Sequence, residues 1–454
     1  MKRAKLKVTQ KANGSERKKQ MSKYWGKESQ KAAENFTYNL PRVDNDLIKA
    51  IAEVKKAALF ASWKNGEIDK DVHRALDQAS GEVIAGKLDR EFAQPFLQGG
   101  AGTSINMNVN EVIANRGQEL LKGKKRIHPN DHVNRHQSTN DVNPSALKIV
   151  CIRLSDNLIA SLDDLIEELR KKAKEFEGIK KVGRTHVQDA LPTTLGQEFK
   201  SYADILTADK KRIIEATSYM YELNLGGTAI GNSISAPKNY IKEVYPALAK
   251  ITGLKLTPAA NLMCGTSSGA DFAHLSSVVT VLFSDLSKIA GDLRFMASGP
   301  MGGIGEISLT PLQAGSSIMP GKVNPVMPET INQVYFYILG NNLTIFEAST
   351  NAHLELGIMF PVLAGSIIST LKVASQSIKL FKDRCISTVR ANKERCSEHL
   401  ERSTAYATLL VPKLGYDKVS EMVKKAVSEK RTIREVMLEN KLLTEKEFDE
   451  LTNI

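Results

Sequence analysis

Three short segments of this chain combine glycine, hydroxyl and amide residues in a way that suits the binding of an anion. They are Ser138-Thr139-Asn140-Asp141, Gly183-Arg184-Thr185-His186 and Gly315-Ser316-Ser317-Ile318-Met319-Pro320-Gly321-Lys322-Val323-Asn324. Because neutral hydrogen-bond donors dominate and carboxylates are scarce, an anionic substrate would meet donors without a competing negative charge. Thr103, which follows a glycine-rich turn, is a fourth candidate of the same kind.

The run 315–324 is the most informative of these segments. Two glycines around the serine pair allow successive backbone N–H groups to point at an anion, and Lys322 adds a positive charge. A phosphate-binding P-loop is the competing interpretation. However, five residues separate the two glycines, and Val323 stands where that loop requires Ser or Thr. We therefore expect an anion site of another kind, with a plain surface turn as the alternative.

These segments resemble the active-site motifs of the fumarase/aspartase superfamily of lyases. GSSIMPGKVNP is similar to the signature loop of that family, and STND and GRTHVQDALP are similar to its two other site segments, in the same order. The resemblance covers about residues 24–454. It is nearest to the aspartate ammonia-lyases, because Val326-Met327-Pro328-Glu329 follows the loop and Thr139 stands where fumarases tend to carry serine.

The resemblance implies a mainly α, three-domain fumarase/aspartase-like fold. Its central bundle of long helices would assemble as a homotetramer with active sites shared between subunits. It also implies a cofactor-free carbon–nitrogen lyase that expels ammonia from L-aspartate and gives fumarate through an aci-carboxylate intermediate. The alternatives are a fumarate hydratase, or another C–N lyase of the superfamily acting on a succinyl-type substrate. In a different class, a catalytically silent structural homologue is the remaining alternative.

The resemblance further implies a role for each site residue. Ser316 is expected to be the base, and it must act as an alkoxide stabilised by neighbouring N–H groups and the Lys322 charge. The substrate's β-carboxylate is expected to be held by Thr103, Ser138, Thr139 and Ser317. Its α-carboxylate is expected to be held by Thr185, Lys322 and Asn324. Asn140 and His186 are expected near the departing amine.

Three histidines at four-residue spacing, His128, His132 and His136, raise the question of a metal site. Pro129 and Asn130 interrupt the helix that would align them, and no cysteine joins them, so no metal is expected. By resemblance to fumarases, the segment around His128 and Asn130 is instead expected to form a second, weaker dicarboxylate site.

The elements that must position these segments are long helices. Apolar residues recur at three- and four-residue steps after Pro144, which predicts a helix from that proline to Gly178. Comparable patterns predict further long helices over 195–225, 268–297, 327–350 and 362–383. Because helices of this length need partners along their whole surface, the pattern favours an obligate oligomer.

The changes in composition along the chain predict four parts. Residues 1–23 are expected to be a basic, disordered segment, and 24–140 an N-terminal domain. Residues 141–391 are expected to form the central helical domain that carries the loop 315–324. Residues 392–454, with breaks at Pro412 and Gly415 and a helix cap at Thr444, are expected to form a small helical domain.

The net charge of +12 does not indicate nucleic-acid binding. Residues 1–20 contain eight Lys or Arg and a single Glu, so the excess lies in one short segment. Aromatic residues make up only 6% of the chain, and no apolar run is long enough to cross a bilayer. Four scattered cysteines favour free thiols in a reducing cytoplasm. We therefore expect a cytoplasmic enzyme with no nucleic-acid or membrane partner.

Four residues depart from the pattern of the aspartate ammonia-lyases. They are Asn143, Ser145, Gly357 and Phe360, which stand where an aromatic, threonine, asparagine and an acidic or polar residue are usual. These differences leave the choice between aspartate, malate and another succinyl-type substrate open, but not the reaction class.

Overall fold

The computed structural model of the chain describes residues 22–453, which are mainly helical as expected. Contacts divide these residues into two compact units. Unit 1 comprises 22–154, Ala216–His274 and Asn342–Ser369. Unit 2 comprises Ser155–Glu215, Leu275–Asn341 and 370–453. The three-domain division expected from the sequence stays a prediction.

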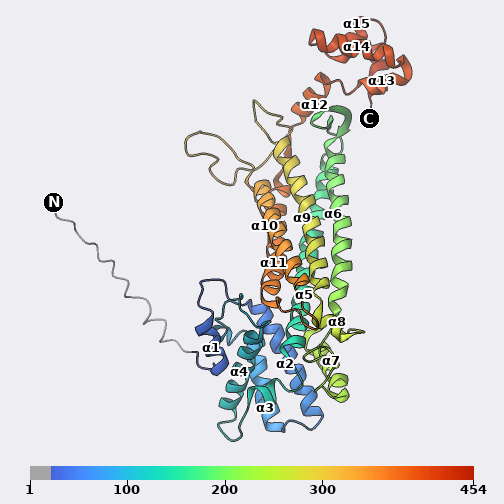
Figure 1. Ribbon diagram of the computed structural model, residues 1–454. Helices are drawn as coiled ribbons and strands as arrows, with labels where there is room; N and C mark the ends of the chain where they lie inside the picture. The colour runs from blue at the N-terminus through green and yellow to red at the C-terminus, as the bar shows by residue number, and fades with distance from the viewer. Residues whose placement is uncertain (1–21, 454) are drawn as a thin grey trace, which may run out of the picture. The chain divides into compact units, whose positions relative to one another are not determined.

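Unit 1 is built on short and medium helices. They are α1 (Lys27–Asn35), α2 (Asn45–Lys64), α3 (Lys70–Ile84), α4 (Thr103–Leu120), α7 (Lys238–Thr252) and α8 (Leu262–Ser267). Helix α2 packs against α3, α4 and α7 (Figure 1). Small residues such as Ala50, Ala57 and Ala61 are fully buried along α2, which allows these neighbours to approach closely. Unit 1 also contains the short turns η2 (Asp89–Glu91), η3 (Pro129–Val133) and η4 (Tyr219–Tyr221).

Five long helices confirm the predicted periodicity. They are α5 (Thr139–Glu175), α6 (Leu195–Ser218), α9 (Ala270–Met296), α10 (Val326–Thr350) and α11 (Phe360–Arg384). Their portions within unit 2 run alongside one another (Figure 1). Leu158, Leu162 and Leu165, which the pattern places on the apolar face of α5, are fully buried. Burial of this stripe gives the bundle its hydrophobic core.

Helix α5 begins at Thr139, five residues before the proline that was expected to lie in its first turn. Pro144 has no N–H, so the carbonyl of Asn140 loses its usual partner within the helix. The side-chain amide of Asn224 donates a hydrogen bond to that carbonyl at 3.0 Å. The boundary prediction was therefore wrong, because a residue distant in sequence compensates for the missing bond.

A β-hairpin that the sequence did not predict projects from the helices of unit 2. Strands β1 (Lys180–Thr185) and β2 (Gln188–Thr194) are antiparallel, with Thr185 opposite Gln188. The two turn residues, His186 and Val187, have φ angles of 53° and 64°. Positive φ at both positions is the geometry of a type I′ turn, which matches the twist of the strands.

Two further pairs of very short strands occur in the described residues. In unit 1, β3 (Glu222–Leu223) pairs in parallel with β4 (Thr257–Pro258). In unit 2, β5 (Ile307–Ser308) forms an antiparallel pair with β6 (Arg390–Ala391). The turn η5 (Ile386–Thr388) precedes β6 in the chain. The second pair brings the start of the segment that carries Ser316 beside the C-terminal segment.

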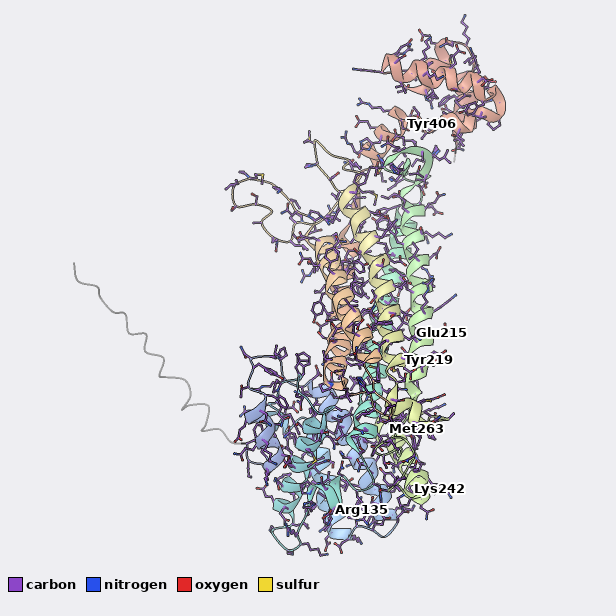
Figure 2. The ribbon with its side chains drawn as sticks, viewed as in Figure 1. Arg135, Glu215, Tyr219, Lys242, Met263 and Tyr406 are labelled. Atoms are coloured by element: carbon purple, nitrogen blue, oxygen red, sulfur yellow. The ribbon has the colours of Figure 1, made fainter. Side chains whose placement is uncertain are left out.

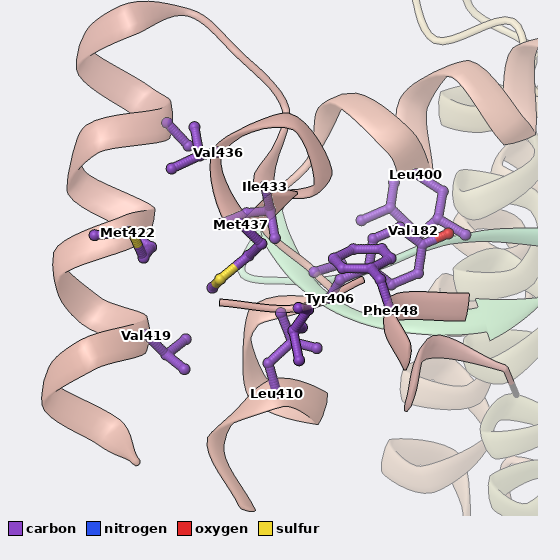
Figure 3. Packing of buried hydrophobic residues seen from close by; sticks show 13 residues of the cluster. Val182, Leu400, Tyr406, Leu410, Val419, Met422, Ile433, Val436, Met437 and Phe448 are labelled. Carbon is purple, nitrogen blue, oxygen red and sulfur yellow. The ribbon is translucent and has the colours of Figure 1, made fainter. Parts of the chain in front are cut away.

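The C-terminal segment of unit 2 consists of five short helices. They are α12 (Lys393–Arg402), α13 (Ala407–Leu414), α14 (Tyr416–Glu429), α15 (Ile433–Glu439) and α16 (Glu445–Thr452). Their apolar side chains form one cluster that also includes Val182 of β1 (Figure 3). Thr444 caps α16 as expected, in a capping box with Glu447. Strand β1 is thus packed against the C-terminal segment.

Several sequence expectations concern single chemical features. The basic segment 1–23 lies outside the described residues, except for Ser22 and Lys23. All four cysteines are free thiols, as expected, and all but Cys264 are buried. Within residues 22–453, no helix is long and apolar enough to cross a membrane.

Candidate active site

The segment 138–141 is fixed in place by one buried carboxylate. Asp141 is fully buried, and one of its oxygens accepts a hydrogen bond from the N–H of Ser138 at 2.9 Å. The other oxygen accepts from the N–H groups of Gly226 and Thr228, each at 3.0 Å. The hydroxyl of Ser138 in turn accepts from the N–H of Asn140 at 3.2 Å. These bonds hold the start of α5 against the segment that follows β3.

A buried lysine, Lys55 of α2, lies near this carboxylate. Lys55 has no exposed surface, and its ammonium donates to the side-chain oxygen of Asn134 at 2.6 Å. Burial raises the pKa of Asp141 to about 6, although three N–H groups and the Lys55 charge oppose the shift. Burial likewise lowers the pKa of Lys55 to about 7, against the attraction of Asp141. Sequence reasoning missed this pair, although a lysine on the buried face of an alanine-rich helix was a signal.

The segment just before Ser138 is held by a second carboxylate, that of Glu67. His136 Nε2 lies 2.6 Å from Glu67, and Arg135 Nε lies 3.2 Å from the same oxygen (Arg135 is labelled in Figure 2). The other ring nitrogen of His136 lies 2.8 Å from the carbonyl of Ser235. His136 is therefore engaged in local contacts on both ring nitrogens.

Thr103 begins α4 directly after a glycine turn. Gly102 has a φ of 83°, and a Cβ at this position would lie 2.6 Å from the side-chain nitrogen of Asn143. That nitrogen donates to the carbonyl of Gly102 at 3.1 Å, while the hydroxyl of Thr103 donates to the carbonyl of Gly100 at 2.8 Å. Asn143, one of the departures from the family pattern, thus ties α5 to the turn that presents Thr103.

Unit 1 brings four predicted site residues together. Thr103, Ser138, Thr139 and Asn140 all line one pocket of about 820 Å³. The residues that line the pocket include no acidic or basic side chain, and Leu356, Ile358 and Met359 are among its apolar lining residues. An anion entering here would meet hydroxyl and amide groups and no charged side chain of either sign.

The structure brings only one of the two residues of the predicted second site to a pocket. Asn130 lines a pocket of about 620 Å³ that Thr103, Ser138 and Thr139 also border, whereas His128 does not line it. The ring of His128 accepts a hydrogen bond from the N–H of Asp131 at 3.3 Å and so caps η3. Within residues 22–453, no group of three or more His, Cys, Asp or Glu is placed to hold a metal ion.

Two more departures from the family pattern border the residues gathered in unit 1. Gly357 and Phe360 line a small cavity of about 40 Å³ together with Thr139 and Asn140. The N–H of Gly357 donates to the carbonyl of Thr266 at 3.1 Å, and no atom lies closer than 3.8 Å to where its Cβ would be. A side chain at this position would therefore begin in ordinary van der Waals contact with its neighbours.

Unit 2 carries the other predicted residues on two exposed segments. Thr185 and His186 lie exposed at the tip of the β1–β2 hairpin. Ser316, Ser317, Lys322 and Asn324 lie on the loop that connects β5 to α10. Ser317 and Lys322 are exposed, whereas Ser316 and Asn324 are half-buried.

The loop folds back on itself around Ser316. The side-chain amide of Asn324 donates to the carbonyl of Gly315 at 2.8 Å, which closes the loop. A Cβ at Gly315 would lie 2.0 Å from the carbonyl oxygen of Lys322, so only glycine allows this approach. The hydroxyl oxygen of Ser316 accepts hydrogen bonds from the N–H groups of Ile318 and Met319, each at 3.2 Å. Two donors thus already face the oxygen on which an alkoxide charge would lie.

Comparisons with known proteins show the family to which the chain is related. A family model described as lyase matches residues 15–340, and one described as fumarase C C-terminus matches residues 407–454. An aspartate ammonia-lyase from Bacillus subtilis is 41% identical over 434 residues, which cover 95% of this chain and 91% of that protein. A class II fumarate hydratase from Thermus aquaticus is 40% identical over 435 residues, covering 94% and 93%.

A solved structure confirms the fold. The recombinant class II fumarase from Schistosoma mansoni superposes with a TM-score of 0.91 at 31% identity, over 95% of this chain and 94% of that one. The helical architecture expected from the resemblance is therefore correct. The matches extend across both compact units and all three motif segments, so the chain belongs to the fumarase/aspartase superfamily of lyases.

Proposed function

We propose that this enzyme is an aspartate ammonia-lyase that converts L-aspartate reversibly into fumarate and ammonia. A base removes a proton from the carbon next to the β-carboxylate, and the electron pair moves into that group as an aci-carboxylate. The pair then returns to form the carbon–carbon double bond as the C–N bond breaks and ammonia leaves. The reaction needs no cofactor, because the substrate's own carboxylate takes up the charge.

The observation that carries the proposal is the environment of the Ser316 hydroxyl. A serine hydroxyl is a weak base unless its deprotonated form is stabilised. Two backbone N–H groups already donate to the Ser316 oxygen, and Lys322 lies on the same loop. Donors fixed in advance lower the energy of a developing oxyanion without reorganisation during the reaction, and one such donor is worth about 2.7–4 kcal/mol.

The remaining roles follow from the family motifs. We assign Thr103, Ser138, Thr139 and Ser317 to the β-carboxylate, on which the second negative charge develops. We assign Thr185, Lys322 and Asn324 to the α-carboxylate, and Asn140 and His186 to the departing amine. The unit 1 pocket supports its part of this assignment, since it offers hydroxyl and amide groups and no carboxylate.

Ammonia elimination is favoured over hydration by residues near the motifs. Thr139, and the sequence Val326-Met327-Pro328-Glu329 after the loop, have the form typical of aspartate ammonia-lyases. Fumarate hydratase is the second candidate, because relatives named for each activity have similar identities to this chain, 41% and 40%. The cavity beside Gly357 also leaves another succinyl-type substrate as an alternative.

We further propose that the enzyme is a cytoplasmic homotetramer with shared active sites. Helix α10 carries no Lys or Arg in its 25 residues. Four of its large apolar side chains, at steps of three and four residues, are exposed: Phe336, Leu339, Leu343 and Phe346. A stripe of this kind on a long helix is the surface that another copy of the chain would cover.

The absorbance of fumarate provides the test of the substrate. Purified enzyme is supplied with L-aspartate and, separately, with L-malate, and the ultraviolet absorbance of fumarate is followed. We expect absorbance to rise with aspartate and to fall when fumarate and ammonia are supplied together. Turnover of malate alone would replace the ammonia-lyase assignment by the hydratase.

The role of Ser316 is tested by Ser316→Ala. A positioned base typically contributes about 10²–10⁴-fold to the rate, so we expect kcat to fall by about that factor. Size-exclusion chromatography and circular dichroism should show an unchanged assembly, because Ser316 packs against no hydrophobic core. Wild-type turnover in this variant would eliminate Ser316 as the base.

A further inference from the structure

Glu306 is a fully buried carboxylate at which three segments of unit 2 meet. It lies directly before β5, and therefore at the start of the segment that leads to Ser316. Its oxygen Oε1 accepts a hydrogen bond from the guanidinium of Arg184 at 2.8 Å and lies 3.0 Å from Nδ1 of His399. Arg184 belongs to β1 and His399 to α12, so one oxygen joins the hairpin to the C-terminal segment.

The second oxygen and the backbone of Glu306 are engaged as well. The ammonium of Lys181, also on β1 and almost fully buried, lies 3.1 Å from Oε2 as an ion pair without hydrogen-bond geometry. Its hydrogen bonds go instead to Glu198, at 2.7 Å, and to the carbonyl of Val182, at 3.3 Å. The N–H of Glu306 donates to the carbonyl of Met296, and its carbonyl accepts from the N–H of Asn392 at 2.9 Å. Both the carboxylate and the backbone of Glu306 thus have partners in the surrounding segments.

The charges around Glu306 favour its ionised form. Burial alone raises the pKa of this carboxyl, but the hydrogen bond from Arg184 and the charge of Lys181 outweigh burial, and the pKa lies below its usual range. Charge-assisted hydrogen bonds to a planar guanidinium are short and directional. An ionised Glu306 therefore fixes the direction of Arg184, the residue directly before Thr185.

Packing supports the same connection. Val182, which lies between Lys181 and Arg184 on β1, is inserted in the apolar cluster of the C-terminal segment (Figure 3). Between Val182 and Arg184 the strand carries an irregularity in its pairing with β2. Such bulges redirect the side chains that follow them. Val182 therefore packs the strand against the C-terminal segment. The irregularity after it changes the direction of the Arg184 side chain, immediately before the exposed tip.

We infer that Glu306 is a positioning residue of the lyase reaction. It holds the hairpin tip with Thr185 and His186, and the start of the loop with Ser316, in a fixed relation to each other and to α12. Glu306 does not touch substrate; it acts through Arg184 and through its own place before β5. This inference rests on the proposed function, since it assigns Glu306 to the same reaction.

The test replaces the carboxylate by a neutral group of the same shape, Glu306→Gln. Because small displacements of positioned groups can cost about 10²-fold in rate, we expect kcat to fall by about 10–100-fold. Hydrogen exchange read by mass spectrometry should become faster in residues 184–188 and 309–325. The variant Arg184→Gln should show the same two changes, and the double variant should be little worse than either single one.

The matched control is Asp209→Asn in α6. Asp209 is also fully buried in unit 2 and paired with an arginine, Arg212, but it touches neither the hairpin nor the loop. We expect this variant to keep kcat and the exchange of both segments, whatever its effect on stability. If kcat and hydrogen exchange change equally in Asp209→Asn and Glu306→Gln, Glu306 has only a general structural role.

The outcomes separate this inference from the proposed function. The exchange measurement needs no turnover, so it decides the inference even if the wild type acts on malate or on no dicarboxylate tested. Wild-type exchange of residues 184–188 and 309–325 in Glu306→Gln would overturn the inference and leave the proposed function intact. If Glu306→Gln does not fold, Arg184→Gln removes the same hydrogen bond at a less buried position, and the same readouts apply.

Discussion

At the scale of single residues, the candidate site depends on charged groups buried behind it as much as on the polar groups that line it. Asp141 and Glu306 each hold backbone or side-chain donors next to predicted substrate contacts, and neither is exposed. A buried carboxylate that accepts several hydrogen bonds fixes the orientation of the donor groups, because they have no alternative partner in the buried environment. Rigidity of the proposed site would thus come from buried residues that lie behind its polar groups.

The buried Lys55 should make stability depend on pH. Its pKa falls from 10.5 when unfolded to about 7 when folded, so between these values the unfolded chain binds more protons. The free energy of unfolding should therefore rise with pH through Lys55 in this window, by up to about 1.4 kcal/mol per pH unit. In Lys55→Met this contribution should vanish, and urea denaturation at pH 7, 8 and 9 should give a flatter profile than the wild type.

The same comparison has its own internal checks. Asp141 has a raised pKa of about 6, so its contribution falls with rising pH below that value and does not overlap the window. Lys64→Met, at an exposed position of α2, measures the general effect of removing a lysine charge. If the free energy of unfolding depends on pH with the same slope in Lys55→Met and in the wild type, Lys55 binds its proton equally well in the folded and unfolded chain.

Sequence reasoning proposed the polar groups of the candidate site but not the buried charged groups that the structure places behind them. Ser316, Thr139 and Thr185 stand in recognisable motifs, because their chemistry requires particular residue types at fixed spacing. Glu306 looks like an ordinary surface charge in the sequence, and the only local signal for Lys55 is its place on the apolar face of an alanine-rich helix. Their partners lie 79 or more positions away, such as Asn134 for Lys55 and Arg184 for Glu306, and no local pattern reveals those contacts.

At the scale of elements, helices could be predicted and the hairpin could not. The long helices follow from a repeated apolar stripe, and the observed bounds lie within a few residues of the expected ones, except that α6 ends at Ser218 and not at 225. Strands β1 and β2 lack a regular alternation of polar and apolar residues, and their turn is His-Val where Asn-Gly is typical. The start of α5 was also misjudged, since Asn224 supplies the bond that Pro144 removes from the helix.

The hairpin turn provides a prediction at this scale. Val187 is β-branched, 64% exposed and held at a φ of 64°, a region that costs an L-residue about 1–2 kcal/mol. Glycine adopts this conformation freely but loses about 0.5–1 kcal/mol of backbone entropy. Val187→Gly should therefore raise the free energy of unfolding, by up to about 1 kcal/mol, as measured by urea denaturation.

A second valine makes the comparison specific to the turn. Val427 is 63% exposed but lies within α14, where glycine is about 0.5–1 kcal/mol less favourable than alanine. Val427→Gly should therefore lower stability while Val187→Gly raises it. Destabilisation by both substitutions would mean that the turn does not strain Val187.

At the scale of the whole molecule, the predicted site residues are distributed over two separately packed units. Thr103, Ser138, Thr139 and Asn140 belong to unit 1, whereas the hairpin tip and the Ser316 loop belong to unit 2. Each unit alone offers only some of the groups that the proposed reaction uses. The proposed tetramer would allow one protomer to supply the unit 1 residues and another the unit 2 residues.

Complementation between inactive variants distinguishes shared from self-contained sites. A protomer with Ser138→Ala is damaged in unit 1, and one with Ser316→Ala is damaged in unit 2. If each site combines units from different protomers, mixed assemblies contain some sites with both lesions and others with none. Co-expressed variants, purified through two different tags, should then show activity well above that of either parent. If each protomer builds its own site, every site carries one lesion and the mixture stays as inactive as its parents.

A second mixture is the control for activity that returns for any reason other than shared sites. Ser316→Ala and Lys322→Met lie on the same loop, so no site assembled from these two protomers receives an undamaged loop. This mixture should remain inactive under either arrangement, and recovery in it would point to exchange of wild-type protein or to a loop that tolerates loss of the lysine. Activity restored only when the lesions lie in different units would require that the catalytic serine act on substrate held by another copy of the chain. The exposed apolar stripe on α10 would then be needed for catalysis and not only for stability, because no single protomer could bring both sets of groups to one substrate.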